Sequence, residues 1–201
     1  MLIMKNKEKI LQMTEENKGF VTNTQINKLG ISPGSLKYLV DMGALERVSR
    51  GLYVLPGVAG DKLYGLQTRY KKGIFSEETA LFLHKISGIE PERVHMTFPI
   101  SYHTQSLLTE NIKYHRVKED YDSGVVTLKT AEGNPVRVYR IERTLCDILK
   151  ERNHTDVYVI AEAFKQYLSS EHTELELLFE YAKKFRVEKK LNLFLKNSVS
   201  M

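Results

Sequence analysis

The stretch that decides the fold is residues 22–55, TNTQINKLGISPGSLKYLVDMGALERVSRGLYVL. Thr22 and Gln25 have the spacing of a capping box, which predicts the start of a short helix. Ser32 fits the cap of the following helix, with Pro33 at the first helical position, where its missing N–H costs nothing. Two short helices joined by a tight turn indicate a helix-turn-helix.

A hairpin is predicted directly after these helices. Residues 45–48 and 52–55 are short strand-like runs, and the connection Ser49-Arg50-Gly51 supplies a glycine for a turn that needs a positive φ. Ahead of the motif, residues 5–16 repeat apolar side chains at helical spacing. Three helices and then a hairpin is the order of a winged helix-turn-helix. We therefore expect residues 1–56 to form a DNA-binding domain of this type.

The winged fold also indicates which residues would contact DNA. Its second motif helix lies in the major groove, and its hairpin contacts the DNA backbone or the minor groove. The predicted contacts are the polar and aromatic residues off the apolar stripe of that helix and the two arginines of the hairpin: Ser32, Ser35, Lys37, Tyr38, Arg47 and Arg50. Two alternatives stay open, because lysines on short helices are often only solvated and winged helices also serve as protein-interaction modules.

Composition excludes several classes of protein. The 201 residues are 42% hydrophobic and 27% charged, which indicates a globular chain. No apolar run reaches the roughly 18 residues of a membrane span, and the first residues lack the apolar core of a signal peptide. We therefore expect a cytoplasmic protein with no membrane partner. The excess of five positive charges permits an anionic partner without requiring one.

The pattern changes after the small residues at 56–60, and we place a second domain at residues 62–201. Alternating apolar runs between residues 94 and 139 predict a small sheet, and helical spacing continues from residue 141. The expected fold class is α+β, an N-terminal winged helix-turn-helix followed by a mixed α/β C-terminal domain with a small sheet and a helical tail. Four basic residues after the boundary either extend the DNA-binding surface or belong to a solvated surface helix, which we favour: Lys62, Arg69, Lys71 and Lys72.

The sequence offers little for catalysis. Its six histidines lack His-x-x-x-His and His-Glu-x-x-His spacing, and there is no Gly-x-x-x-x-Gly-Lys loop, so we expect no metal, no cofactor and no catalytic residues. The single cysteine, Cys146, lies beside the apolar face of a predicted helix, where a buried, inert thiol is expected. On the same helix, Arg143 and Asp147 stand four residues apart and should form an ion pair.

Three segments keep one order along the chain: residues 45–53, LERVSRGLY; residues 75–84, FSEETALFLH; and residues 142–149, ERTLCDIL. Together they resemble the AbiEi family, the antitoxins of bacterial AbiE abortive-infection systems, which are type IV toxin–antitoxin systems. The first is similar to the family's wing, the second to its Ser-x-x-(Ser/Thr)-Ala-Leu-x-Leu-His helix, and the third to its Glu-Arg-Thr-(Leu/Ile)-x-Asp helix. The resemblance marks five antitoxin-domain positions: Ser76, His84, Glu142, Arg143 and Asp147.

The resemblance implies two activities, neither of them enzymatic. The winged domain of such a protein represses its own operon, with two copies expected on an operator of inverted repeats. Its C-terminal domain counteracts a cognate AbiEii-like nucleotidyltransferase toxin without forming a stable complex with it. In this context the pair of Arg143 and Asp147 is either structural, which we favour, or part of a surface that contacts the toxin or its nucleic-acid substrate.

Two other functions fit the same residues. One is a winged-helix transcription regulator whose C-terminal domain senses a ligand or dimerises. The other is a nuclease positioned by the winged domain, although the Glu-x-Lys within residues 187–190 lacks a preceding strand with a partner aspartate. A nucleotidyltransferase gene next to this one would favour the antitoxin over both.

Overall fold

The computed structural model describes residues 2–58, 60–103, 105–107 and 111–199. They pack into two compact units, one of residues up to 71 together with 130–134, the other of residues 72–129 and those from 135 onward. The chain therefore divides at Lys71–Lys72, later than the predicted boundary at residues 56–62.

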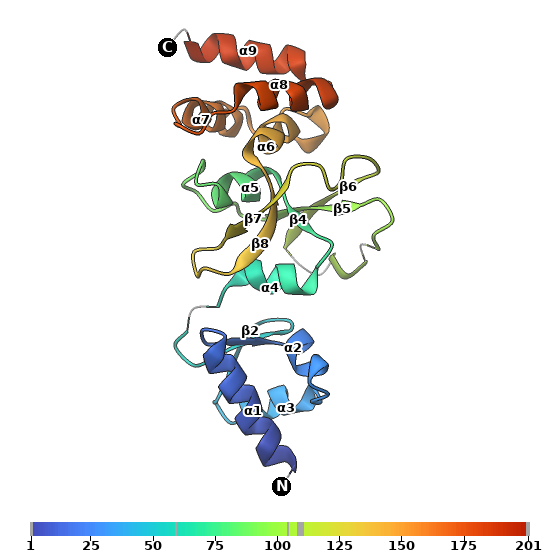
Figure 1. Ribbon diagram of the computed structural model, residues 1–201, viewed down its shortest axis with the longest axis vertical. Coiled ribbons are helices and arrows are strands. Elements are labelled where there is room, and N and C mark those ends of the chain that lie inside the picture. The colour runs from blue at the N-terminus through green and yellow to red at the C-terminus, as the bar shows by residue number, and fades with distance from the viewer. Residues whose placement is uncertain (1, 59, 104, 108–110, 200–201) are drawn as a thin grey trace. The chain divides into compact units, whose positions relative to one another are not determined.

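The first unit has the element order of a winged helix-turn-helix (Figure 1). Its three strands form an antiparallel sheet in the order β1-β3-β2. The apolar sides of the three helices close one core, made of Ile10, Val21, Ile26, Ile31, Leu36, Leu39 and Leu45. The elements are α1 (Leu2–Glu16), β1 (Phe20–Thr22), α2 (Asn23–Lys28), α3 (Gly34–Asp41), β2 (Glu46–Ser49), β3 (Leu52–Val54) and a further helix, α4 (Lys62–Arg69).

Local cap chemistry explains where the motif helices begin. The Thr22 hydroxyl accepts from the Gln25 amide at 3.3 Å, and the Gln25 side chain accepts from the Thr22 amide at 2.8 Å, which confirms the capping box. Helix α3 begins at Gly34, one residue later than predicted. Pro33 already has helical angles, φ −54° and ψ −24°, and the Ser32 hydroxyl accepts from the Gly34 amide at 3.3 Å.

The hairpin turn is shorter than the predicted three residues. Ser49 pairs directly with Leu52, so only Arg50 and Gly51 form the turn, and Gly51 has the expected positive φ of 84°. Val48 is the extra residue of a β-bulge between the pairs of Arg47 and Ser49. The bulge lengthens β2 by one residue without lengthening β3, a shift that apolar alternation does not reveal.

Helix α4 belongs to the first unit because it packs on the sheet of that unit. The rings of Phe20 and Tyr64 meet edge to face with 5.1 Å between centroids. Asp61 caps the helix by accepting from the Tyr64 amide at 2.8 Å. Its second oxygen accepts from Asn134 Nδ2 at 2.9 Å and from the Thr130 hydroxyl, and this contact places residues 130–134 with the first unit.

The second unit is a five-stranded mixed sheet with helices, in the strand order β6-β5-β4-β8-β7 (Figure 1). The very short strand β4, which was not predicted, pairs antiparallel with β5 and parallel with β8. The α+β fold class is thus confirmed. The elements are β4 (Ile74–Phe75), α5 (Glu77–Leu83), β5 (Val94–Pro99), η1 (Gln105–Leu107), β6 (Ile112–Val117), β7 (Val125–Lys129), β8 (Pro135–Tyr139), α6 (Ile141–Ile148), η2 (Glu151–Asn153), α7 (Val157–Leu168), α8 (Leu175–Lys184) and α9 (Glu188–Val199).

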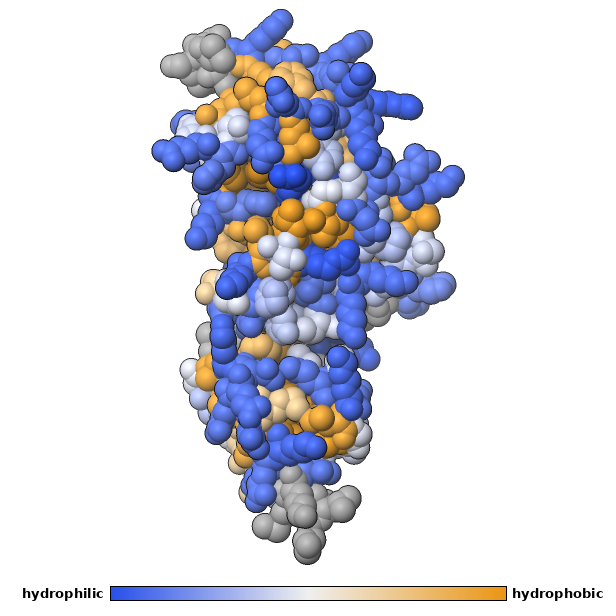
Figure 2. Space-filling model, viewed as in Figure 1, coloured by the Kyte–Doolittle hydropathy of each residue, from blue (hydrophilic) through white to orange (hydrophobic). Residues whose placement is uncertain are grey.

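Hydrophilic side chains cover much of the face drawn in Figure 2, with smaller apolar areas between them. Within the described residues, every helix is too short or too polar to cross a bilayer.

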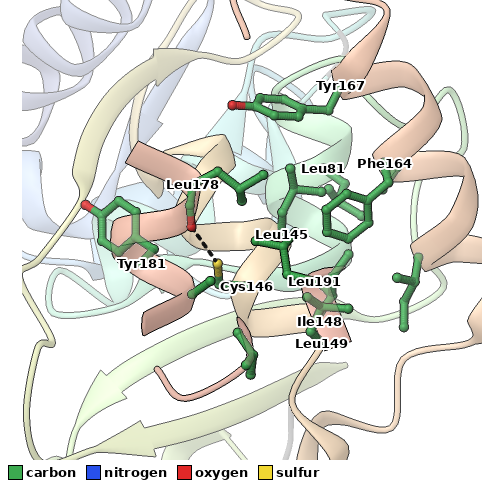
Figure 3. Close-up of a cluster of buried hydrophobic side chains, with 14 residues drawn as sticks. Leu81, Leu145, Cys146, Ile148, Leu149, Phe164, Tyr167, Leu178, Tyr181 and Leu191 are labelled. Carbon is green, nitrogen blue, oxygen red and sulfur yellow. Dashed lines mark hydrogen bonds between the residues drawn. The ribbon is translucent and has the colours of Figure 1, made fainter. Parts of the chain in front are cut away.

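The helical part of the second unit is organised around α6, which is buried along its length. Figure 3 shows Leu145 and Ile148 of α6 among apolar side chains from α5, α7, α8 and α9. Cys146 lies in this cluster with its Sγ 3.6 Å from the carbonyl oxygen of Leu178. Burial raises the pKa of the Cys146 thiol to about 12, so the thiolate needed for nucleophilic chemistry is strongly disfavoured.

Candidate nucleic-acid interface

The predicted DNA-contacting residues lie on the outside of the first unit. Leu36 and Leu39 are fully buried, which anchors one face of α3 in the core and turns the other face outward. Five of the six predicted residues are exposed and the sixth, Ser35, is half-buried; the exposed ones are Ser32, Lys37, Tyr38, Arg47 and Arg50. Within the described part of the chain the three cationic side chains have no ion-pair partner, so their charge is available to phosphates.

The structure brings the hairpin turn next to the helix-turn-helix. The carbonyl oxygen of Gly51 accepts from the Asn23 amide, the first residue of α2, at 3.0 Å. The two residues are close in space, because a Cβ atom placed on Gly51 would lie 3.7 Å from the Asn23 side chain. Arg50, the neighbour of Gly51, is therefore held close to the start of α2 by the backbone.

The outer face of α3 is not strongly basic. Lys37 is balanced by Asp41 one turn later, and the exposed apolar side chains of Tyr38 and Met42 have the same four-residue spacing. Tyr38 is 45% exposed and Met42 is 59% exposed. Such a helix is suited to contacts with base edges and thymine methyl groups, and the exposed arginines of the hairpin are the residues expected to contact phosphates.

Ser76 and His84 at the two ends of α5 have structural contacts in the second unit. The Ser76 hydroxyl accepts from the Thr97 hydroxyl at 3.0 Å and makes no hydrogen bond to the first turn of α5. His84 Nε2 lies 2.8 Å from the carbonyl oxygen of Tyr139, to which it can donate. Burial lowers the pKa of His84, which favours the neutral ring.

The predicted pair of Arg143 and Asp147 is confirmed, with 3.2 Å between Nε and Oδ2. The guanidinium also donates to the carbonyl oxygens of Asp120 and Ser123, and it lies 3.6 Å from the centroid of the Tyr139 ring. Arg143 is only 2% exposed, so these contacts favour the structural interpretation of the pair.

Glu142 is the third member of this motif and is buried as well. Its carboxylate accepts from the Tyr167 hydroxyl at 3.1 Å and from Arg140 Nε at 3.2 Å, which links α6 to α7. The part of Ser76, His84, Glu142, Arg143 and Asp147 in antitoxin activity stays a prediction.

The structure also contains a buried cluster that no sequence motif indicated, in which two histidines and a lysine surround the Glu77 carboxylate. Glu77 Oε1 lies 2.8 Å from His115 Nε2, and Oε2 lies 3.2 Å from His95 Nδ1 and 3.5 Å from Lys113 Nζ. Glu77 also has a positive φ of 49°, a strained backbone for a residue other than glycine. Only the parallel register of β5 and β6, which pairs Thr97 with His115, brings the two histidines near one carboxylate.

Two opposing effects act on the Glu77 carboxyl. Burial by itself would raise its pKa, but the hydrogen bonds and charges of His115 and His95 outweigh burial and lower the pKa to about 2. Both carboxylate oxygens are thus engaged by nitrogen atoms. In the described parts of the chain, no three His, Cys, Asp or Glu side chains converge as metal ligands would.

Comparison with known protein families gives a match for the first unit. Residues 8–56 match the model of a family described as "Transcriptional regulator, AbiEi antitoxin". This match confirms the predicted resemblance for the first unit and includes the wing at residues 45–53, while the other two segments lie outside it. None of the curated proteins compared with the chain matches it.

A solved structure shares the fold over most of the chain. The crystal structure of the RV2827C protein from Mycobacterium tuberculosis superposes with a TM-score of 0.58 at 11% sequence identity, covering 89% of this chain and 71% of that one. At this identity the similarity shows the fold alone.

Proposed function

Since residues 8–56 match the AbiEi antitoxin family of transcriptional regulators, we propose that the chain is an antitoxin that represses its own operon. The observation that carries the proposal is a winged helix-turn-helix, within the matched residues, whose α3 and hairpin expose Lys37, Arg47 and Arg50. Their charges and the outward face of α3 suit duplex DNA.

The proposal extends to the partners of the protein. Two copies bind inverted repeats in the operator, because each winged unit presents one recognition helix to one half-site. The second unit counteracts an AbiEii-like nucleotidyltransferase toxin without a stable complex. The activity is not enzymatic and takes place in the bacterial cytoplasm.

The variant Lys37→Ala/Arg50→Ala is expected to bind operator DNA more weakly and with a smaller salt dependence. Removing one phosphate-binding cation lowers the slope of log affinity against log salt by about 0.9, so the double variant should show a slope smaller by about 1.8. The measurement is a gel shift of the upstream region of the gene over a series of salt concentrations.

The control variant is Lys129→Ala/Lys165→Ala, which removes two exposed lysines of the second unit and thus the same net charge. It should leave the slope within error of the parent protein. An unchanged slope in Lys37→Ala/Arg50→Ala would show that these residues do not bind phosphates.

Antitoxin activity is tested with the neighbouring nucleotidyltransferase gene. Cells that express this gene should stop growing, and co-expression of the full chain should restore growth. The Lys37→Ala/Arg50→Ala variant should still restore growth while it loses repression of an operator reporter, because the changed residues lie in the first unit only. Failure of the parent chain to restore growth would favour a regulator whose second unit senses a ligand or dimerises.

A further inference from the structure

The second unit contains an open cleft of about 1120 Å³ at the junction of α8 and α9. Its walls also include residues that follow β6 and α6. Eight of the lining side chains are cationic and four are anionic. The cleft therefore holds most of the excess of five positive charges that the whole chain carries.

Half of the cations in the cleft are already paired. Lys184 Nζ lies 2.6 Å from Asp120 Oδ1, and Lys190 Nζ lies 3.0 Å from Glu151 Oε1. Arg143 and Lys150 both contact Asp147 beneath the cleft. The other four cations are exposed and, among the residues that the structure describes, have no ion-pair partner: Arg152, Lys183, Arg186 and Lys189. They outnumber the two remaining carboxylates of the lining, so the cleft attracts anions.

The four cations come from two segments that are far apart in the sequence. Three of them come from the segment KKFRVEKK, residues 183–190, in which α8 ends and α9 begins. Arg186 takes the left-handed conformation at this junction, with φ 60°, where glycine is more usual. The Val187 amide closes the turn by donating to the carbonyl oxygen of Ala182 at 2.9 Å. The fourth cation, Arg152, is contributed by η2.

An aromatic ring lies in the wall of the cleft. Phe185 is half-buried, and its ring is packed against Lys150 Nζ at 3.8 Å, the Arg143 guanidinium at 5.0 Å and the stacked Tyr181 ring at 5.8 Å, all measured from the ring centroid. Sites for single-stranded nucleic acid use a groove of cations that follows the phosphates. The ring shapes the wall of this groove, and the unpaired cations supply the binding charge.

We propose that this cleft binds single-stranded nucleic acid, with phosphates on Arg152, Lys183, Arg186 and Lys189. Small-molecule pockets measure roughly 300–1,000 Å³, and this open cleft is larger, as a polymer segment requires. Duplex DNA is read by a protruding helix or ribbon that enters a groove, whereas this surface is concave. The site lies in the second unit and goes beyond the proposed operator contacts of α3 and the hairpin.

The test uses the full chain and fluorescein-labelled oligonucleotides of about 12 nucleotides, uridine RNA and thymidine DNA, a length within the usual single-strand site sizes. Fluorescence anisotropy over a salt series compares the parent protein with the variant Arg152→Ala/Lys183→Ala/Arg186→Gly/Lys189→Ala. Glycine at 186 keeps the left-handed backbone. The variant should bind at least about tenfold more weakly, and its salt slope should fall by about 3, since each single-strand phosphate contact contributes about 0.7.

The matched control is Lys72→Ala/Lys85→Gly/Lys129→Ala/Lys165→Ala, which removes four exposed lysines outside the cleft, one of them at a left-handed φ of 60°. It should retain affinity. Tighter binding of RNA than of DNA would show that the 2′-hydroxyls are read, and equal binding would show a site for either strand. Equal single-strand affinity of the cleft variant and the parent would overturn the proposal.

A decrease in affinity confined to duplex operator DNA would also overturn the proposed single-strand site.

Photocrosslinking of 4-thiouridine RNA to the unaltered chain is a second test, which does not depend on the folding of the variant. Crosslinks should map to residues 183–190 or to Arg152, and crosslinks confined to the first unit would contradict the site.

Discussion

Replacing Arg143 by alanine is expected to lower the free energy of unfolding by about 3–5 kcal/mol, the cost of removing one partner from a buried ion pair. The substitution leaves the Asp147 carboxylate, which is itself mostly buried, without its Nε donor at 3.2 Å. It also removes the donor to the Asp120 and Ser123 carbonyl oxygens and empties the space over the Tyr139 ring. Urea unfolding followed by circular dichroism measures the decrease.

Two further variants make this prediction specific. Lys190→Ala removes a cation from the exposed pair with Glu151, and should destabilise the protein far less than Arg143→Ala. In Arg143→Lys the ammonium keeps the charge but cannot make all the guanidinium contacts, so most of the destabilisation should remain. A destabilisation in Arg143→Ala as small as that in Lys190→Ala would mean that the buried network does not hold α6 in place.

The second large effect is expected from Glu77→Gln and depends on pH. The pKa of Glu77 is about 2 in the folded protein against an ordinary value of 4.5. A lowered folded-state pKa contributes stability that is fully present above pH 4.5 and is lost as the pH falls towards 2. Each unit of pKa difference corresponds to about 1.4 kcal/mol, so above pH 4.5 the Glu77 carboxylate stabilises the folded protein by about 3 kcal/mol. Glu77→Gln should therefore be less stable than the parent protein at neutral pH by about this amount.

The comparison is the difference in unfolding free energy between parent and variant, measured by urea titration at several pH values between neutrality and pH 3. The difference should shrink as the pH falls below 4.5, because the unfolded parent protein then takes up a proton on Glu77 while the folded protein keeps the carboxylate charged until about pH 2. Glu78→Gln, which changes the neighbouring and more exposed residue of α5, should show little difference at any pH. A difference for Glu77→Gln that stays constant with pH would contradict the role of the carboxylate charge.

The winged unit could be predicted from sequence because its signals are local. The capping box of Thr22 and Gln25 involves atoms within one helical turn, and the glycine of the hairpin turn is set by the φ it must adopt. The outward position of Lys37 follows from the apolar stripe of Leu36 and Leu39 on the same helix. The bulge at Val48 escaped prediction because it depends on pairing with another strand.

The domain boundary and the missed sites depend on contacts between residues far apart in the chain. Helix α4 joins the first unit through the Phe20 and Tyr64 rings and through Asp61, whose partner Asn134 is 73 residues away. No pattern within α4 shows these partners. The pair of Arg143 and Asp147 was predictable from its four-residue spacing, but its burial was not.

Sequence alone determined the start of α2, the presence of the hairpin, the α+β class and the outward face of α3, since each depends on side chains a few residues apart. Tertiary structure alone decided that Glu77 meets His95 and His115, and that Arg152 lies in one cleft with Lys183, Arg186 and Lys189. The physical reason is that strand register and helix packing bring distant residues together. Those charged residues form a site only after the chain has folded.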